Sequence, residues 1–305
     1  MGKISSLISG YKKRGLIEGI RWSSAHLFQE VLVRKFPTDT FDYPRTNVLD
    51  EEWDLLVLLD GCRVDTLQQV SGEYDWLPEE IGSKYSVAGG SQPWMERTFG
   101  GRTFDSLSYI SGNPHTELVL RDQQFHLLDE VWQYSWDHDI GTIRPRPITD
   151  RTISHFRSEE TGDQVIAHYM QPHFPSLTHP SLGSEMSFEE VGSEWSGNIW
   201  DQLVGGKVER ETVIEAYRDN LRAVLNDVEV LIENVDAETV VISADHGNAI
   251  GERGYYGHGD FRVPEVRQVP WVEVSASDSG EYTPETRKTA DEYSVEDRLE
   301  SLGYM

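Results

Sequence analysis

The heptapeptide DLLVLLD at residues 54–60 decides the fold of this 305-residue chain. Its central side chains are all Leu or Val, with no alternation of apolar and polar residues. Such a short apolar run is typical of a strand that is buried on both faces, as in a parallel sheet covered by helices. Asp60 then lies at the carboxyl end of the strand, where open parallel sheets gather their functional groups.

The chain beyond this run alternates strand-like and helix-like segments. Further strands are predicted at residues 106–111, 164–170, 239–243 (TVVIS) and 269–274. Residues 209–235 are predicted to form a long helix, because apolar side chains recur along one face of it. The order of strand, long helix and strand predicts an α/β fold, with a mostly parallel central sheet and helices on both faces.

Residues 1–46 differ in charge from the rest of the chain. They contain eight basic and four acidic side chains, whereas the whole chain has a net charge of -26, so residues 47–305 hold -30. The apolar residues of segment 1–35 recur at helical spacing, which predicts a basic amphipathic helix. Such a helix can lie on an anionic membrane surface, or it can pack on a partner or on the main domain that we expect at 47–305.

Two later segments show no regular pattern. Residues 176–208 are rich in Gly, Ser, Glu and Trp, and we expect a long loop or cap beside the functional site there. Residues 275–292 are polar and are expected on the surface, before a short last helix at 294–302.

The composition is strongly acidic and poor in lysine. Asp and Glu number 53 against 27 Lys and Arg, and only seven of these basic residues are Lys. Excess charge keeps a protein soluble, and concentrated salt screens the resulting self-repulsion. We expect a protein adapted to molar salt, with an ordinary acidic cytosolic enzyme as the alternative. Binding to nucleic acid is disfavoured in both cases, because the phosphate backbone would be repelled.

Cysteine usage and hydropathy indicate the compartment. Cys62 is the only cysteine, which excludes an internal disulfide and a thiolate metal cluster, and we expect it to be a small packing residue. Lys12, Lys13 and Arg14 interrupt the N-terminal apolar stretches, so no signal peptide is predicted. The longest apolar run, 55–59, is too short to cross a bilayer. A cytoplasmic protein is expected, with peripheral contact to the inner membrane face through residues 1–35 as an alternative.

Two of the predicted strands end in acidic side chains, and the sequence predicts a metal site between them. Asp60 follows the first strand, and Asp245 and His246 follow the fourth. Buried carboxylates side by side repel each other unless a cation lies between them. Oxygen and imidazole ligands together suit Zn²⁺ or Mn²⁺, whereas carboxylates alone suit Mg²⁺ or Ca²⁺. A Gly-His-Gly sequence a few residues further on adds His258 to the candidates.

The sequences LVLLDGCRVDTL (56–67) and VISADHGNAIGERGYYGHGD (241–260) resemble motifs of the alkaline phosphatase–sulfatase superfamily. The resemblance extends to VEDRLESLGYM (295–305), which looks like the closing helix of many sulfatase-like chains. It implies that residues 47–305 form an alkaline-phosphatase-like catalytic domain.

The same resemblance implies roles for individual residues. Asp60, Asp245 and His246 become ligands of a divalent metal ion, and His258 becomes either a ligand of a second ion or a donor to the substrate oxygens. Two-metal members supply an Asp and a His from a mid-chain loop, whereas the corresponding stretch HYMQPHFPSLTHP (168–180) offers histidines but no Asp. One ion (Zn, Mn, Mg or Ca) is therefore expected, and a second stays open. His173, within this stretch, is assigned to substrate or leaving-group binding or to that second ion.

The resemblance also implies a nucleophile within SVAGGSQPWMERTFGG (86–101), at the start of a helix predicted at 93–99. Ser91 is the first candidate and Ser86 the second. A helix N-terminus favours both an ionised nucleophile and the anionic group that it attacks. A metal ion held nearby would lower the pKa of the hydroxyl group, as covalent catalysis requires.

The motif departs from that of true sulfatases, C/S-x-P-S-R, whose first residue is oxidised to formylglycine. Ser91, Gln92 and Pro93 match its first three positions, but Trp94 and Met95 replace the Ser and the Arg. This difference argues against formylglycine and hence against ordinary sulfatase chemistry.

Three further polar residues have less specific interpretations. His168 is expected to be a core histidine within its strand. Asn113, in YISGNPH (109–115), is expected to line the substrate pocket or to serve only the turn beside Pro114. Arg63 is expected in a surface ion pair, with contact to an anionic substrate as the alternative.

These residues together predict a metal-dependent hydrolase of phosphate mono- or diesters. Ser91 would attack the phosphorus, and His173 or His258 would assist the leaving group. The substrate would be a small-molecule, lipid-linked or sugar-linked phosphate or sulfate ester. The alternatives are hydrolysis of a sulfuric ester, transfer of a phospho-group between alcohols, and a non-catalytic protein that binds a membrane surface or a partner.

The salt prediction has a direct test. Raising the KCl concentration from about 0.15 M to about 2 M is expected to raise the thermal unfolding temperature, because the added ions screen repulsion among the acidic side chains. Differential scanning calorimetry measures the change. An unfolding temperature that stays constant or falls would contradict adaptation to molar salt and would favour the ordinary acidic enzyme.

Overall fold

The computed structural model describes residues 44–159, 162–180, 182, 199–259 and 262–285. A six-stranded sheet forms its centre, in the order β13-β9-β2-β8-β4-β5. All neighbouring strands in it are parallel except β13, which is antiparallel to β9. The predicted α/β class with a mostly parallel sheet is therefore confirmed. The strands of this sheet are β2 (Leu55–Leu59), β4 (Thr103–Ser111), β5 (Gln124–Glu130), β8 (Gln164–Tyr169), β9 (Ala237–Ser243) and β13 (Val272–Ala276).

Strand β2 lies inside the sheet, between β9 and β8, and all its side chains are buried. Its odd-numbered side chains pack into one apolar core with residues of α9 (Arg210–Ile232). Its even-numbered side chains point to the other side, into a second core with residues of α4 (Ser91–Phe99). The sequence of β2 does not alternate because each face of the strand meets its own helix layer.

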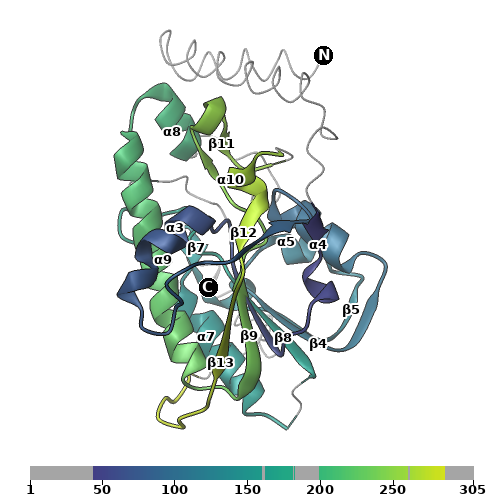
Figure 1. Ribbon diagram of the computed structural model, residues 1–305. Coiled ribbons are helices and arrows are strands. Elements are labelled where there is room, and N and C mark those ends of the chain that lie inside the picture. Colours follow the sequence, from purple (N-terminus) through teal and green to yellow (C-terminus); the bar gives the residue numbers. More distant parts are fainter. Residues whose placement is uncertain (1–43, 160–161, 181, 183–198, 260–261, 286–305) are drawn as a thin grey trace, which may run out of the picture.

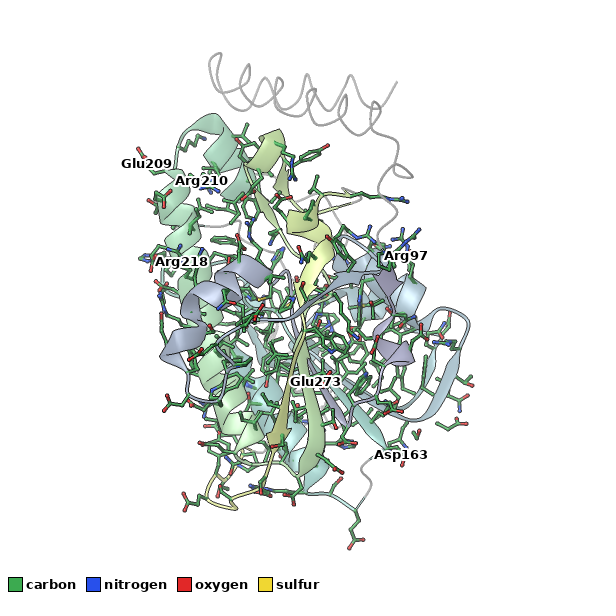
Figure 2. All side chains as sticks on the ribbon, viewed as in Figure 1. Arg97, Asp163, Glu209, Arg210, Arg218 and Glu273 are labelled. Atoms are coloured by element: carbon green, nitrogen blue, oxygen red, sulfur yellow. The ribbon has the colours of Figure 1, made fainter. Side chains whose placement is uncertain are left out.

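Helices cover both faces of the sheet, as predicted (Figure 1). α9, α7 (Pro145–Phe156) and α3 (Val64–Val70) lie on one face, whereas α4 and α5 (His115–Val119) lie on the other. α9 corresponds to the long helix predicted at 209–235. Figure 2 shows Arg218 projecting from the outer side of this helix, opposite its apolar face.

The single strand predicted at 269–274 is wrong, because the chain changes sheets within it. β12 (Gln268–Pro270) pairs with β3 (Ser83–Ser86) in a small sheet that also contains β1 (Arg45–Thr46), whereas β13 pairs with β9. The change falls at Trp271, whose backbone N–H donates to the carbonyl oxygen of Gly82 (2.8 Å). Both short strands contain buried apolar residues, which suggested one strand, but Pro270 cannot donate a backbone hydrogen bond and ends β12 just before the change of sheets.

The segment 176–208, expected to be a loop or cap, contains a helix. α8 (Ile199–Gly205) packs on α9 and on strand β11 (Tyr256–Gly257). Its seven residues are too few to show a helical period in the sequence. Trp200 of this helix joins an apolar cluster with Phe174 and Tyr217.

The remaining short elements are η1 (Val48–Asp50), η2 (Ser71–Glu73), α6 (Trp132–Ser135), β6 (Trp136–Asp137), β7 (Thr142–Ile143), β10 (Ala249–Ile250), η4 (Glu252–Gly254) and α10 (Pro264–Arg267). The amphipathic helix predicted within 1–35 and the helix predicted at 294–302 lie outside the described residues. Within the described part of the chain, no helix combines the length and the apolar character that crossing a bilayer requires.

Truncation of a β2 side chain tests the two-sided burial. Leu58 is fully buried, so Leu58→Ala is expected to lower the free energy of unfolding by about 3 kcal/mol. Leu118, which is 50% exposed, provides the matched control. Leu118→Ala is expected to change the free energy of unfolding by less than about 0.5 kcal/mol. Urea unfolding followed by circular dichroism measures both values. Equal effects of the two substitutions would contradict the central position of β2.

Candidate active site and metal centre

Two carboxylates meet at the carboxyl ends of the neighbouring strands β2 and β9. Asp60 follows β2 and Asp245 follows β9 after one alanine, and both are almost completely buried. The backbone N–H groups of Gly61 and His246 donate to Asp245 Oδ1 (3.1 and 2.9 Å). Asn113, after β4, donates its side-chain N–H to Asp60 Oδ2 (2.6 Å). The parallel sheet thus brings together side chains that are far apart in the sequence.

The remaining oxygen of each carboxylate has no hydrogen-bond partner. Asp60 Oδ1 and Asp245 Oδ2 are buried and unpaired among the described residues. Burial and the neighbouring Asp245 carboxylate raise the pKa of Asp60 well above its ordinary value. Unpaired buried carboxylate oxygens carry a large desolvation penalty, which a cation between them removes. The two orphaned oxygens therefore fit a divalent metal ion.

His246 presents one ring nitrogen to both carboxylates. Its Nδ1 lies 2.8 Å from the carbonyl oxygen of Gly247 and donates to it, because that oxygen can only accept. Its Nε2 is left free for a ligand role and lies 3.5 Å from Asp60 Oδ1 and 3.5 Å from Asp245 Oδ2. The structure brings together all three residues that the sequence suggested as ligands. An acceptor that fixes the ring of a metal-binding histidine in this way is a common feature of metal sites.

Ser91 lies at the first position of α4, and its hydroxyl points into the same site. The hydroxyl donates to Asp60 Oδ2 (3.1 Å) and lies 3.4 Å from His246 Nε2. The predicted helix thus starts two residues earlier than expected, with Gly90 as its N-cap. Ser91 therefore has the carboxylate, the imidazole and the helix N-terminus around one oxygen atom.

Close backbone contacts fix the loop that precedes Ser91. Gly259 donates its backbone N–H to the carbonyl oxygen of Gly89 (2.6 Å), and a Cβ atom at Gly89 would lie 2.1 Å from the carbonyl oxygen of Gly259. Any larger residue at position 89 would clash with this carbonyl oxygen, so only glycine fits there. Arg97, visible on α4 in Figure 2, donates to the carbonyl oxygen of Val87 (2.7 Å). Ser86, the second candidate nucleophile, instead donates to the backbone carbonyl of Asp245 and so serves to hold the loop against β9.

His173 and His258 form a pair at the edge of the site. Their Nε2 atoms lie 3.1 Å apart, and the ring of His258 stacks on that of His246, with centroids 4.4 Å apart. Desolvation by the surrounding protein lowers the pKa of His173 to about 4 and also lowers the pKa of His258, although the His258 ring is exposed at the rim of the site. Both are therefore neutral imidazoles at neutral pH, the form that binds a metal ion or accepts a proton.

Helix α9 holds the loop that contains His173. Asn220, buried within α9, donates its side-chain amide to the carbonyl oxygens of His173 (3.1 Å) and Pro175 (2.9 Å). Tyr217, one turn earlier, donates to the carbonyl oxygen of Gly61, directly after Asp60. Figure 2 shows Arg210 at the N-terminal end of the helix, where it donates to the carbonyl oxygen of Ile250 (2.7 Å). The long helix thus positions three separate loops of the site.

Two sequence-based interpretations of polar residues need revision. Arg63 forms the expected ion pair with Asp65 (2.7 Å), whose side chain is 58% exposed, but its own side chain is only 8% exposed and also pairs with Glu252 (3.1 Å). Asn113 does more than serve the turn, where its Oδ1 accepts from the backbone N–H of His115 (2.9 Å), because its amide also donates to the candidate ligand Asp60. Cys62 is buried in the apolar core, as expected of a packing residue.

His168 and His115 also belong to the surroundings of the site. His168, expected to be a satisfied core histidine, is buried in β8, but its Nε2 has no hydrogen-bond partner within the described chain. His115 starts α5, and its buried Nδ1 is likewise unpaired among the described residues. The sequence does not reveal these unpaired nitrogens. The apolar sequence of β8 does not tell which face of the strand lies toward Asp60, and the position of α5 relative to the site is set only in the folded chain.

No protein-family model and no curated protein sequence matches the chain. Several solved structures are similar to it. The integral membrane protein lipooligosaccharide phosphoethanolamine transferase A (EptA) from Neisseria meningitidis matches over 83% of this chain and 55% of its own length, with 13% identity and a TM-score of 0.48. A 2-O GAG sulfatase matches over 77% of this chain and 64% of its own, with 12% identity and a TM-score of 0.48.

A third similar structure contains zinc. The C-terminal periplasmic domain of EptC from Escherichia coli, in complex with Zn, matches over 79% of this chain and 75% of its own, with 11% identity and a TM-score of 0.35. This chain spans little more than half of the length of EptA, at 55%. At such identities the matches concern the fold, and they do not transfer an activity.

The sheet order and the strand-end residues define the class of fold. Asp60 follows a central parallel strand, Asp245 and His246 follow its neighbour, and Ser91 starts a helix facing both. This arrangement is an α/β fold with a mostly parallel sheet, and it places the candidate ligands and nucleophile together, as the resemblance of the sequence motifs implied.

Metal removal tests the carboxylate pair. Zn²⁺ added to the metal-free protein is expected to raise the free energy of unfolding by about 2.7 kcal/mol when the free Zn²⁺ concentration is about 100 times the dissociation constant. Asp245→Asn is expected to abolish this gain and to leave the metal-free protein at least as stable as the wild type, because one buried charge is removed. Calorimetry with and without chelator measures both effects.

Asp65→Asn is the matched control, because the Asp65 side chain is 58% exposed and lies outside the carboxylate pair. It is expected to keep the full response to Zn²⁺. An undiminished response in Asp245→Asn would contradict the assignment of the metal centre.

Proposed function

We propose that this protein is a metal-dependent enzyme that cleaves phosphate esters through a covalent intermediate on Ser91. The observation that carries the proposal is the position of the Ser91 hydroxyl, 3.1 Å from Asp60 Oδ2 and 3.4 Å from His246 Nε2, at a helix N-terminus. A protein that only binds a partner has no need for a buried hydroxyl beside two carboxylates. An enzyme is therefore the better interpretation than a non-catalytic binding protein.

The first step transfers the phospho-group to Ser91. A bound divalent cation would lower the pKa of the hydroxyl and neutralise charge on the substrate oxygens. Ser91 Oγ attacks the phosphorus as the bond to the leaving oxygen breaks, and the hydroxyl proton passes to Asp60 Oδ2, its hydrogen-bond acceptor. The N–H groups at the start of α4 stabilise the anionic phospho-group.

The histidine pair acts on the leaving group and on the acceptor. His173 Nδ1 donates to the carbonyl oxygen of Phe174 (2.6 Å), so its Nε2 faces His258 as an acceptor. An anionic phosphate beside the pair favours their protonated form, from which a proton passes to the leaving oxygen. In the second step water attacks the phosphorus and passes a proton to the histidine pair, the bond to Ser91 Oγ breaks, and Ser91 regains its proton from Asp60 Oδ2.

The residues after Ser91 favour phosphate over sulfate. Trp94 and Met95 occupy the positions where the sulfatase motif has Ser and Arg, and both are buried in the core under α4. They point away from the solvent-facing side of the helix, so they do not supply the polar groups that formylglycine formation uses. An unmodified Ser91 remains the nucleophile.

The substrate in this proposal is a small-molecule, lipid-linked or sugar-linked phosphate ester. Transfer of the phospho-group to an alcohol differs from hydrolysis only in the second step, in which the alcohol replaces water. The products formed with and without added glycerol distinguish the two reactions. Peripheral membrane contact through residues 1–35 and a cytoplasmic location stay predictions.

Replacement of the nucleophile tests the proposal. Ser91→Ala is expected to lower kcat on aryl phosphate mono- or diesters by at least about 10³-fold, because the covalent step is lost. Gln92→Ala is the matched control, since the Gln92 side chain is exposed and donates to Glu96 on the same helix (3.1 Å), and it is expected to retain activity. Mass spectrometry of quenched wild-type protein is expected to find phosphate on Ser91.

The assay contains Zn²⁺ or Mn²⁺ and includes an aryl sulfate for comparison. Cleavage of the sulfate alone, with formylglycine at position 91, would show a sulfatase instead. Unchanged turnover in Ser91→Ala would remove Ser91 as nucleophile, and a metal-loaded protein that cleaves none of the esters would overturn the proposed function.

A further inference from the structure

His168 is a buried histidine with one satisfied and one unsatisfied ring nitrogen. It lies in β8, opposite Leu58 of β2 and Ser111 of β4, and is completely buried. Its Nδ1 lies 2.7 Å from the hydroxyl of Tyr109, and the planes of the two rings are nearly parallel, with an interplanar angle of 9°. Tyr109 thus fixes the ring so that Nε2 points toward the carboxylate pair.

Nε2 of His168 reaches both carboxylates at distances too long for hydrogen bonds. It lies 3.9 Å from Asp245 Oδ2 and 4.0 Å from Asp60 Oδ2. Within the described chain, His168 Nε2, Asp60 Oδ1 and Asp245 Oδ2 are all buried and without a hydrogen-bond partner. One ligand atom from each of these three residues lies within 4.8 Å of the other two. Each unpaired buried polar atom is costly, and one cation bound by all three side chains would remove this cost.

The spacing fits a single metal ion. Metal–ligand bonds of about 2.1 Å place neighbouring ligand atoms about 3.0 to 4.2 Å apart, depending on the coordination geometry. The two imidazoles share Asp245 Oδ2, which lies 3.5 Å from His246 Nε2 and 3.9 Å from His168 Nε2. They face different oxygens of Asp60, with His246 Nε2 3.5 Å from Oδ1 and His168 Nε2 4.0 Å from Oδ2. The Ser91 hydroxyl, 3.1 Å from Asp60 Oδ2 and 3.4 Å from His246 Nε2, falls in the same range.

We propose that His168 Nε2 is a further ligand of the metal ion held by Asp60, Asp245 and His246. The ion then has two imidazoles and two carboxylates around it, with the Ser91 hydroxyl as an additional neighbour. This inference rests on the metal site of the proposed function and extends it. Tyr109 is a positioning residue, because its hydroxyl accepts from His168 Nδ1 when Nε2 binds the ion.

Two imidazole ligands narrow the choice of metal. Carboxylate-only sites suit Mg²⁺ or Ca²⁺, whereas nitrogen ligands favour Zn²⁺ and other transition-metal ions. His168 therefore selects a transition metal, chiefly Zn²⁺, for this site. Removal of His168 is expected to weaken Zn²⁺ binding much more than Mg²⁺ binding.

The number of imidazole ligands is measured directly by X-ray absorption spectroscopy at the zinc edge. The sample is the full chain with His173→Ala and His258→Ala, loaded with one equivalent of Zn²⁺, so that the outer histidine pair does not contribute. Two imidazoles are expected, from His168 and His246. A single imidazole would overturn the inference, and this measurement needs no change at His168 itself.

Substituted proteins provide an independent test. Competition between each protein and a chelating dye for Zn²⁺ measures the affinity of the protein for the ion. Tyr109→Phe is expected to lower the affinity about 10-fold or more, as loss of a group that orients a ligand does, and His168→Gln is expected to lower it further. His155→Gln is the matched control: His155 is a buried histidine bonded to Ser108 Oγ (2.9 Å), and its loss is expected to leave the affinity unchanged.

The outcomes separate this inference from the proposed function. Unchanged Zn²⁺ affinity in both His168→Gln and Tyr109→Phe would overturn the role of His168 and leave the serine mechanism standing. A wild-type protein that binds no Zn²⁺ would overturn both. Should His168→Gln fail to fold, the affinity of Tyr109→Phe and the imidazole count decide the question.

Discussion

The repulsion between the buried carboxylates of Asp60 and Asp245 is the constraint on which the rest of the site depends. Two negative charges at the ends of neighbouring strands are unfavourable without an opposite charge between them. Within the described residues, each carboxylate uses one oxygen for hydrogen bonds from the protein and leaves the other without a hydrogen-bond partner. In the proposed function a cation between these oxygens would offset the repulsion and would lower the pKa of the Ser91 hydroxyl.

The α/β architecture supplies the rigidity that such a site needs. The two-sided burial of β2 fixes Asp60, and backbone hydrogen bonds fix Asp245. Tyr217 and Asn220 of helix α9 bond to the loops that contain Gly61 and His173. The close approach of Gly89 to Gly259 holds the loop before Ser91 against the loop that contains His258. Preorganised groups of this kind stabilise charge without rearrangement during the reaction.

Much of this arrangement could be predicted from the sequence because it depends on local pattern. The apolar run before Asp60 and the long amphipathic stretch of α9 are each visible in a single window of residues. Other features depend on which strand lies beside which. The break at Trp271, where the chain changes sheets, is marked only by Pro270, which does not tell which strands β12 and β13 join. The burial of Arg63 follows from its contact with Glu252, far away in the sequence.

The sequence by itself determined the class of fold and the chemical types at the strand ends, because strand burial and the residues that follow a strand are encoded locally. Asp60, Asp245 and His246 belong to this part. The tertiary structure alone decided what surrounds them: that Asn113 bonds Asp60, that Ser86 holds a loop, and that His168 turns an unpaired nitrogen toward the carboxylates. A side chain's face and partners are set by the register of neighbouring strands, and that register is a property of the assembled sheet.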